Sequence, residues 1–106
     1  MIVVNTDAVA GKRIAKSLGL VRGNTIRARH IGKDIMAGLR NLVGGEVHEY
    51  TKLMAESREQ AIDRMIAEAE SLGADAIVNA RFATSQLMGG AAELLVYGTA
   101  VKLEDA

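Results

Sequence analysis

Residues 49–72 read EYTKLMAESREQAIDRMIAEAESL, and this stretch decides the fold class. Apolar or small side chains recur along it every three or four positions, which is the period of an amphipathic α-helix. Charged side chains occupy the opposite face. Gly73 follows and is typical of a helix C-cap. The sequence therefore predicts one helix of about 36 Å. Its inner face is formed by Tyr50, Met54, Ser57, Ala61, Met65, Ala69 and Leu72, and is widened by Leu53, Ile62 and Ile66.

Two strands are expected after this helix. Residues 76–84 and 93–103 alternate in the manner of strands, and residues 85–92, with Gly89-Gly90, form a turn between them. Because the two strands are close in sequence, we expect them to pair as an antiparallel hairpin.

More strands are expected before the helix. Ile2–Val4 begins one. Residues 14–21 and 25–30 form either one long bent strand or two short ones, with a bend or bulge at Gly23-Asn24-Thr25. A helix through residues 11–18 is the competing interpretation of this segment.

A second, shorter helix is predicted from Lys33. Its apolar positions recur at helical spacing, Asp34 suits a helix N-terminus, and Gly44-Gly45 ends it. The sum is an α+β domain with two layers, an antiparallel sheet of three to four strands packed against one short and one long helix. We expect residues 1–106 to form a single domain. The apolar positions of the short helix are Ile35, Met36, Leu39, Leu42 and Val43.

Composition excludes several classes of protein. The 106 residues include no cysteine, proline or tryptophan, and 13 basic groups balance 13 acidic groups. The lack of cysteine excludes disulfides and thiolate metal sites, and it fits a reducing compartment. No membrane span or signal peptide is recognised, so we expect a cytoplasmic location without membrane association. The zero net charge argues against a nucleic-acid partner.

Charge is unevenly distributed along the chain. Residues 1–40 carry eight basic and two acidic groups, whereas residues 41–106 carry five basic and eleven acidic groups. The two halves can neutralise each other within one folded chain, or complementary patches can join neighbouring copies. Both explanations stay open at this point.

Four motifs occur in order along the chain, and Lys33-Asp34-Ile35 opens the short helix. They are Val43-Gly44-Gly45-Glu46, Ser57-Arg58-Glu59-Gln60-Ala61, Leu72-Gly73-Ala74-Asp75-Ala76-Ile77-Val78 and Tyr97-Gly98-Thr99-Ala100-Val101. Together these motifs resemble the YbjQ family, which is small, bacterial and archaeal. The resemblance covers residues 2–103, and Lys33-Asp34 stands where the family usually has Arg-Asp. It implies a two-layer subunit similar to the dodecin subunit, a homo-pentameric ring, and the description of a heavy-metal-binding domain, but no functional residues.

The densest basic group is a candidate anion site. Arg27, Arg29, His30 and Lys33 lie close to the predicted start of the short helix, where free N–H groups favour anions. The alternative is that Arg27 and Arg29 pair with acids of the long helix, in the same chain or the next.

A candidate metal site lies just before the long helix. Glu46, His48 and Glu49 offer one imidazole and two carboxylates, which suit zinc or nickel if a neighbour completes the coordination shell. The alternative is an ordinary solvated helix start. We predict no other cofactor.

These observations favour a binding protein over an enzyme. No catalytic triad is found, and the aromatic residues Tyr50, Phe82 and Tyr97 are each explained by packing. The leading hypothesis is a ring, with five copies, that holds a small ligand or ion where subunits meet. The runner-up is a metal-handling protein that uses His48 with Glu46 and Glu49, or His30. A third option is an enzyme that uses Arg27, Arg29 or Lys33 on an anionic substrate.

Overall fold

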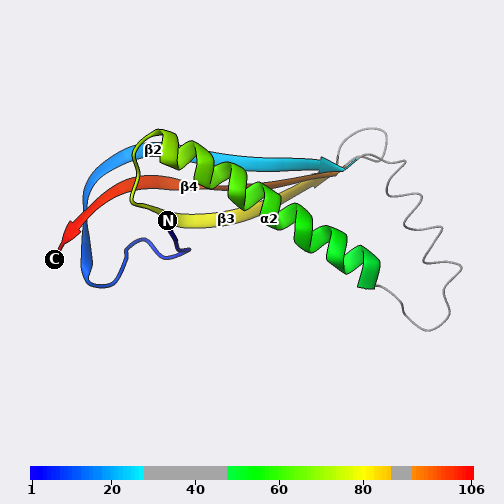
Figure 1. The fold of residues 1–106 in the computed structure, drawn as a ribbon, viewed down its shortest axis with the longest axis horizontal. Helices are drawn as coiled ribbons and strands as arrows, with labels where there is room; N and C mark the ends of the chain where they lie inside the picture. The colour runs from blue at the N-terminus through cyan, green and yellow to red at the C-terminus, as the bar shows by residue number, and fades with distance from the viewer. Residues whose placement is uncertain (28–47, 87–91) are drawn as a thin grey trace, which may run out of the picture.

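One helix lies across one face of a four-stranded sheet (Figure 1). The structure, a computed structural model, describes residues 1–27, 48–86 and 92–106. The two-layer α+β fold is therefore confirmed, while the predicted short helix over residues 33–43 lies outside the described residues. The elements are β1 (Ile2–Val3), β2 (Lys12–Arg27), α2 (His48–Ser71), β3 (Ala76–Gln86) and β4 (Ala92–Asp105), and the strand order is β1-β3-β4-β2.

The sheet is mixed, which corrects the expectation of a purely antiparallel one. β3–β4 and β2–β4 are antiparallel, but β1 runs parallel to β3, with Ile2 opposite Ala76 and Val3 opposite Ile77. Parallel pairing needs a long connection between strands, and here the chain between β1 and β3 includes both β2 and α2. A hairpin argument detects only strands that are close in sequence, so it could not predict this pair.

β2 is one long strand, and the competing helix over residues 11–18 is wrong. The strand pairs with β4 along its whole length, from Lys12 opposite Asp105 to Arg27 opposite Ala92. Its irregularities lie between Ile14 and Lys16 and between Ser17 and Gly19. The predicted bend at residues 23–25 is not found, because this part of β2 keeps regular register with β4.

The inner face of α2 is confirmed from Ser57 to Ala69, but the prediction was wrong for Leu72, which follows the last residue of the helix and is 46% exposed. Ser57, Ala61, Met65 and Ala69 are buried. The helix ends as predicted at Gly73, whose φ is +77°. The Ala74 N–H donates to the Ala69 carbonyl at 3.1 Å, which is the hydrogen bond of a glycine-terminated helix.

Gly23 lets α2 approach β2 closely. A Cβ atom at this position would lie 2.0 Å from the Ala61 carbonyl oxygen and 2.6 Å from the Met65 amide nitrogen. Only a residue without a side chain fits there. The core between the layers is built around this contact, and its other buried members are Val21, Ile77, Val96 and Ala100.

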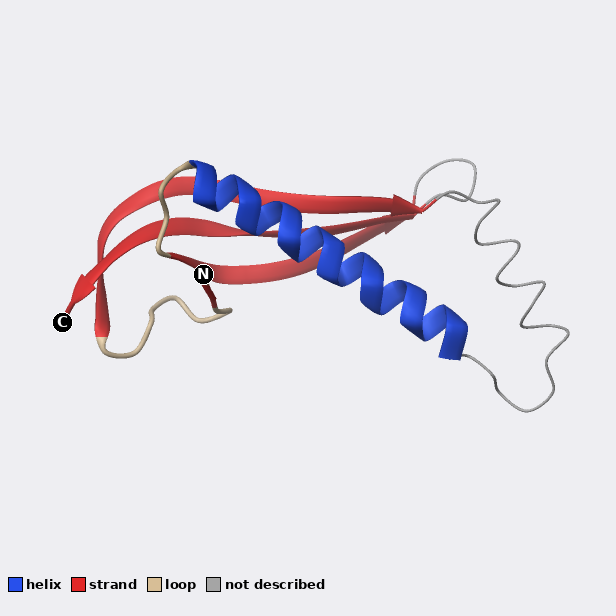
Figure 2. Ribbon diagram, in the orientation of Figure 1, coloured by secondary structure: helices blue, strands red, loops and turns tan. Residues whose placement is uncertain are grey.

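The face of the sheet opposite α2 is covered only in part. A second small core of Ala76, Val78 and Val101 lies there, with Val4 and Val9 of the N-terminal segment packed against it. Of the described elements, only α2 covers the other face, and its N-terminal end extends past the edge of the sheet (Figure 2). The uncovered part of the second face is described below as a candidate site.

Candidate ligand-binding site

The predicted anion residues fall at the boundary of the described chain. Arg27 is the last residue of β2 and lies opposite Ala92 of β4. Arg29, His30 and Lys33 lie outside the described residues. The structure therefore places only one member of this group, at the end of the sheet where β2 ends and β4 begins.

Of the predicted metal ligands, His48 and Glu49 are the first two residues of α2, and Glu46 lies outside the described residues. Among the described residues, no group of three His, Cys, Asp or Glu side chains is arranged to hold a metal ion. The described part of the chain thus contains no complete metal site.

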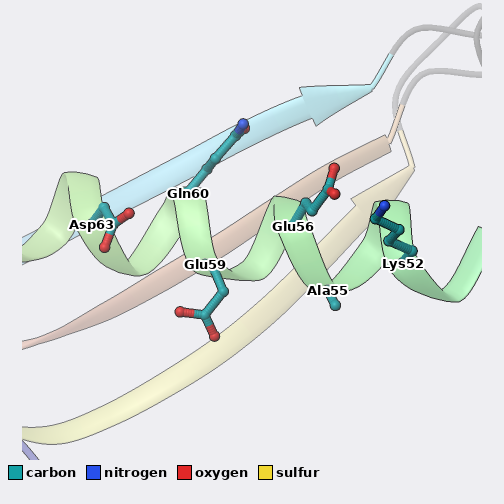
Figure 3. A pocket seen from close by; sticks show the side chains of 6 residues that line it. All are labelled: Lys52, Ala55, Glu56, Glu59, Gln60 and Asp63. Atoms are coloured by element: carbon teal, nitrogen blue, oxygen red, sulfur yellow. The ribbon is translucent and has the colours of Figure 1, made fainter.

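A shallow hollow lies along the outer side of α2 (Figure 3). Figure 3 shows that its carboxylates do not converge, because Glu59 points to one side of the helix while Glu56 points to the other. The hollow also contains the cationic Lys52. Its geometry fits a solvated helix surface better than a cation site. The lining residues are Lys52, Ala55, Glu56, Glu59, Gln60 and Asp63.

Part of the charge asymmetry is neutralised within the chain. Lys12 donates to Asp105 with Nζ and Oδ1 2.7 Å apart, and Arg13 pairs with Glu104. Each pair lies directly across the β2–β4 ladder and joins the basic half of the sequence to the acidic half. This supports neutralisation within one chain for these four groups. All are exposed, so each pair contributes about 0–1 kcal/mol.

Asp75 joins the end of α2 to β4. Its carboxylate accepts a hydrogen bond from the Leu103 backbone N–H at 2.9 Å and one from Lys102 Nζ at 3.3 Å. The Leu103 bond, followed by the bond from Lys102, lowers the pKa of Asp75 below 3.8. This carboxylate is fully engaged in structure, so we assign it no binding role.

The uncovered part of the sheet, here called the open face, is formed by alternate residues of β2, β4 and β3 on the side opposite α2. Leu20 and Ile26 of β2 are 63% and 55% exposed, and Tyr97 of β4 is 37% exposed. This corrects the expectation that packing explains every aromatic residue. The face consists of Leu20, Arg22, Asn24 and Ile26 of β2, Glu93, Leu95, Tyr97 and Thr99 of β4, and Arg81, Ala83 and Ser85 of β3.

Three residues that the sequence analysis missed form one row across the open face. Arg22 of β2 and Arg81 of β3 both lie directly opposite Tyr97 of β4. The Arg81 guanidinium donates to the Asn5 carbonyl at 2.8 Å, whereas the Arg22 guanidinium forms no hydrogen bond or ion pair with any other described residue. Alternation along each strand was visible in the sequence, but the register that aligns the three strands was not.

The sheet also has open edges. Within the described residues, β4 is the only strand paired with β2, so the outer edge of all 16 residues of β2 is free. At the opposite edge, β1 and the segment after it cover only the start of β3. Free edges bind further strands readily.

The comparisons with known proteins now place the chain. A family model named YbjQ and described as "Putative heavy-metal-binding" matches residues 1–104. The chain belongs to the YbjQ family. Its similarity therefore extends over nearly the whole sequence, as the motifs predicted.

Relatives in the family are highly similar and are named only as UPF0145 proteins. The protein of Methanosarcina acetivorans is 61% identical over 103 residues, covering 97% of each chain. That of Archaeoglobus fulgidus is 58% identical, covering 97% of this chain and 95% of its own. The relative from Thermus thermophilus is 55% identical over 106 residues, covering all of this chain and 93% of its own.

A solved structure confirms the fold. A protein of unknown function from the DUF74 family of Pediococcus pentosaceus has a TM-score of 0.63, with 15% sequence identity and 98% coverage of both chains. At that identity the likeness concerns the fold alone. Within the described residues, no helix is both long and apolar enough to cross a membrane.

Proposed function

We propose that the chain is a non-enzymatic, cytoplasmic binding protein that assembles into a closed homo-pentameric ring. In this proposal the ring holds a small ligand or ion where subunits meet. The observation that best supports this proposal is the free outer edge of β2. The free part of β3 lies at the other side of the sheet, so pairing β2 of one copy with β3 of the next is a head-to-tail contact. Contacts of that type form a ring when the rotation between neighbouring copies closes and a filament when it does not, and the proposal is the closed case. The number of five copies rests on the family resemblance.

Phe82 supports a contact at the β3 edge. It lies opposite Val96, a member of the core beneath α2, and so shares the face that α2 covers. Nevertheless it is 49% exposed. A neighbouring β2 placed beside β3 brings with it the α2 that packs on that β2. The same contact therefore satisfies the strand edge and covers this aromatic side chain.

Native mass spectrometry tests the assembly. We expect a species of five times the chain mass, and we expect Phe82→Ser to shift it toward smaller species because apolar contact between copies is lost. Leu72→Ser is the matched control, since Leu72 is 46% exposed but lies at the end of α2. A monomeric wild-type protein, or equal dissociation of both variants, contradicts the proposal.

In the proposed ring, the basic group Arg27, Arg29, His30 and Lys33 supplies the ligand-binding residues. Arg27 supports this placement, because it ends β2, the strand whose free edge would meet the next copy. Five copies of one basic group would give a multivalent site for an anion.

Metal binding is the second candidate function, favoured by the description of the family. It uses Glu46, His48 and Glu49, or His30, with the remaining ligands supplied by another copy. Isothermal titration calorimetry with zinc, nickel and copper tests it. Binding at micromolar concentration that His48→Ala abolishes and His30→Ala preserves assigns the first set, and the reverse assigns His30. Failure of all three metals to bind at micromolar concentration removes this candidate.

A further inference from the structure

We infer that the open face binds a small organic anion at the row formed by Arg22, Tyr97 and Arg81. This inference deepens the proposed function, and rests on it only in taking the protein to bind a small ligand. The site lies within one chain, so it does not depend on the ring. It also lies apart from the basic residues near the end of β2.

The row places two cations on either side of an aromatic ring. Arg22 and Arg81 flank Tyr97 on the two neighbouring strands, so their Cα atoms are about 10 Å apart. The Arg22 side chain is long enough to reach a group held above the central strand, whereas the Arg81 guanidinium is bonded to the Asn5 carbonyl of the segment after β1 and contributes its charge from that side of β3. The Tyr97 ring offers a flat surface between them, on which an aromatic or aliphatic ligand group can pack.

Neither arginine is neutralised by an acid on this face. Among the described residues, Glu93 is the only carboxylate of the open face, and it accepts a hydrogen bond from Asn24 at 3.0 Å. It lies four residues along β4 from Tyr97, or about 13 Å. Arg22 has no described partner, and Arg81 is held by the Asn5 carbonyl, which leaves its charge uncompensated. The row therefore carries two positive charges that favour an anion.

The surroundings of the row are apolar. On the same face, Leu20 lies two residues from Arg22 along β2. Leu95 lies two residues from Tyr97 on β4, and Ala83 lies two residues from Arg81 on β3. A free inorganic anion would use the guanidinium groups alone. An anion attached to a planar or aliphatic body would use both the charges and the apolar surface. The chemistry of the face thus fits a carboxylate or phosphate ester with a small apolar group.

Chemical-shift titration of the ¹⁵N-labelled full chain tests the site. The probe is phenyl phosphate, compared with inorganic phosphate, which lacks the ring, and benzyl alcohol, which lacks the charge. We expect phenyl phosphate to shift the amides of residues 20–24 and 95–99, and to bind about tenfold more tightly than either comparison compound. Benzoate distinguishes a carboxylate site from a phosphate site, and binding of either supports the inference.

Substitutions test whether the charge of Arg22 contributes to phenyl phosphate binding. Arg22→Gln should weaken phenyl phosphate binding about tenfold, since it removes a charge-assisted contact. Arg58→Gln, an exposed arginine on α2, should leave binding unchanged. Tyr97→Phe keeps the ring and should also retain binding.

Three results overturn the inference. The first is equal affinity of Arg22→Gln and wild type for phenyl phosphate. The second is equal affinity of the wild type for benzyl alcohol and phenyl phosphate. The third is a set of amide shifts confined to other parts of the chain. A face covered by another copy of the chain would give the third result. If the protein forms a ring but binds phenyl phosphate no more tightly than Arg22→Gln does, the site is refuted and the ring is not. If a monomeric protein binds phenyl phosphate and Arg22→Gln weakens that binding, the ring is refuted and the site is not.

Discussion

Gly23 shows how one residue sets the distance between the two layers. The Ala61 carbonyl and the Met65 amide of α2 occupy the space that a Cβ atom at Gly23 would need, and both groups belong to the helix backbone. Backbone atoms cannot rotate away as side chains do, so a larger residue must push the helix off the strand. The burial of Val21 and Met65 on either side depends on this close approach.

Gly23→Ala is therefore expected to lower the free energy of unfolding by about 3 kcal/mol, at the upper end of the cost of overpacking a core. Urea denaturation followed by circular dichroism measures the change. Ser17→Ala, an exposed substitution on the same strand, should stay within about 0.5 kcal/mol of wild type. A Gly23→Ala protein as stable as wild type would show that α2 has room to move.

At the scale of elements, α2 and the β3–β4 hairpin could be predicted because their patterns are local. A helical stripe over residues 49–72 and a glycine after it define the helix within one residue at each end. The parallel pairing of β1 and the positions of the bulges in β2 could not be predicted, since they depend on the partner strand.

The same reasoning applies to the candidate site. Basic residues such as Arg27 are found by counting charges along the chain. The row on the open face was missed because Arg22, Arg81 and Tyr97 become neighbours only through the register of three strands. The exposure of Tyr97 also depends on which face α2 covers, and periodicity alone does not reveal that.

Asp75 makes the connection between α2 and β4 sensitive to pH. Its folded pKa lies below the unfolded value, so its ionised form stabilises the fold above pH 3.8, and this stability is lost as the pH falls through the folded pKa. Asp75→Asn should be less stable than wild type at pH 7, and the difference should shrink at pH 3. Urea denaturation at both pH values measures it.

Asp63→Asn is the control for this prediction, because Asp63 lies on the outer side of α2 rather than between elements. As an exposed substitution, it should leave the free energy of unfolding within about 0.5 kcal/mol of wild type. If the free energy of unfolding of Asp75→Asn differs from wild type by the same amount at pH 7 and pH 3, the charge of the Asp75 carboxylate does not stabilise the fold.

At the scale of the whole molecule, the described residues of one chain leave two kinds of surface uncovered. In this part of the chain, the outer edge of β2 and the later part of the outer edge of β3 have no partner strand, and the open face has no second layer over Tyr97 and its neighbours. The two proposals assign different occupants to them, with copies of the chain at the edges and a small anion on the face. A structure of the assembled protein with phenyl phosphate would test both occupants together.

The position of β4 in the sheet has a consequence for biosynthesis. β4 follows every other described element in the sequence, yet it is the strand that joins β2 to β3. The start of β2 at Lys12 therefore cannot pair with β4 until Asp105 has left the ribosome. Partners so distant in sequence slow folding. Until β4 is made, β2 lacks this partner, and the like charges of its five lysine and arginine residues disfavour pairing of β2 with β2 of another chain.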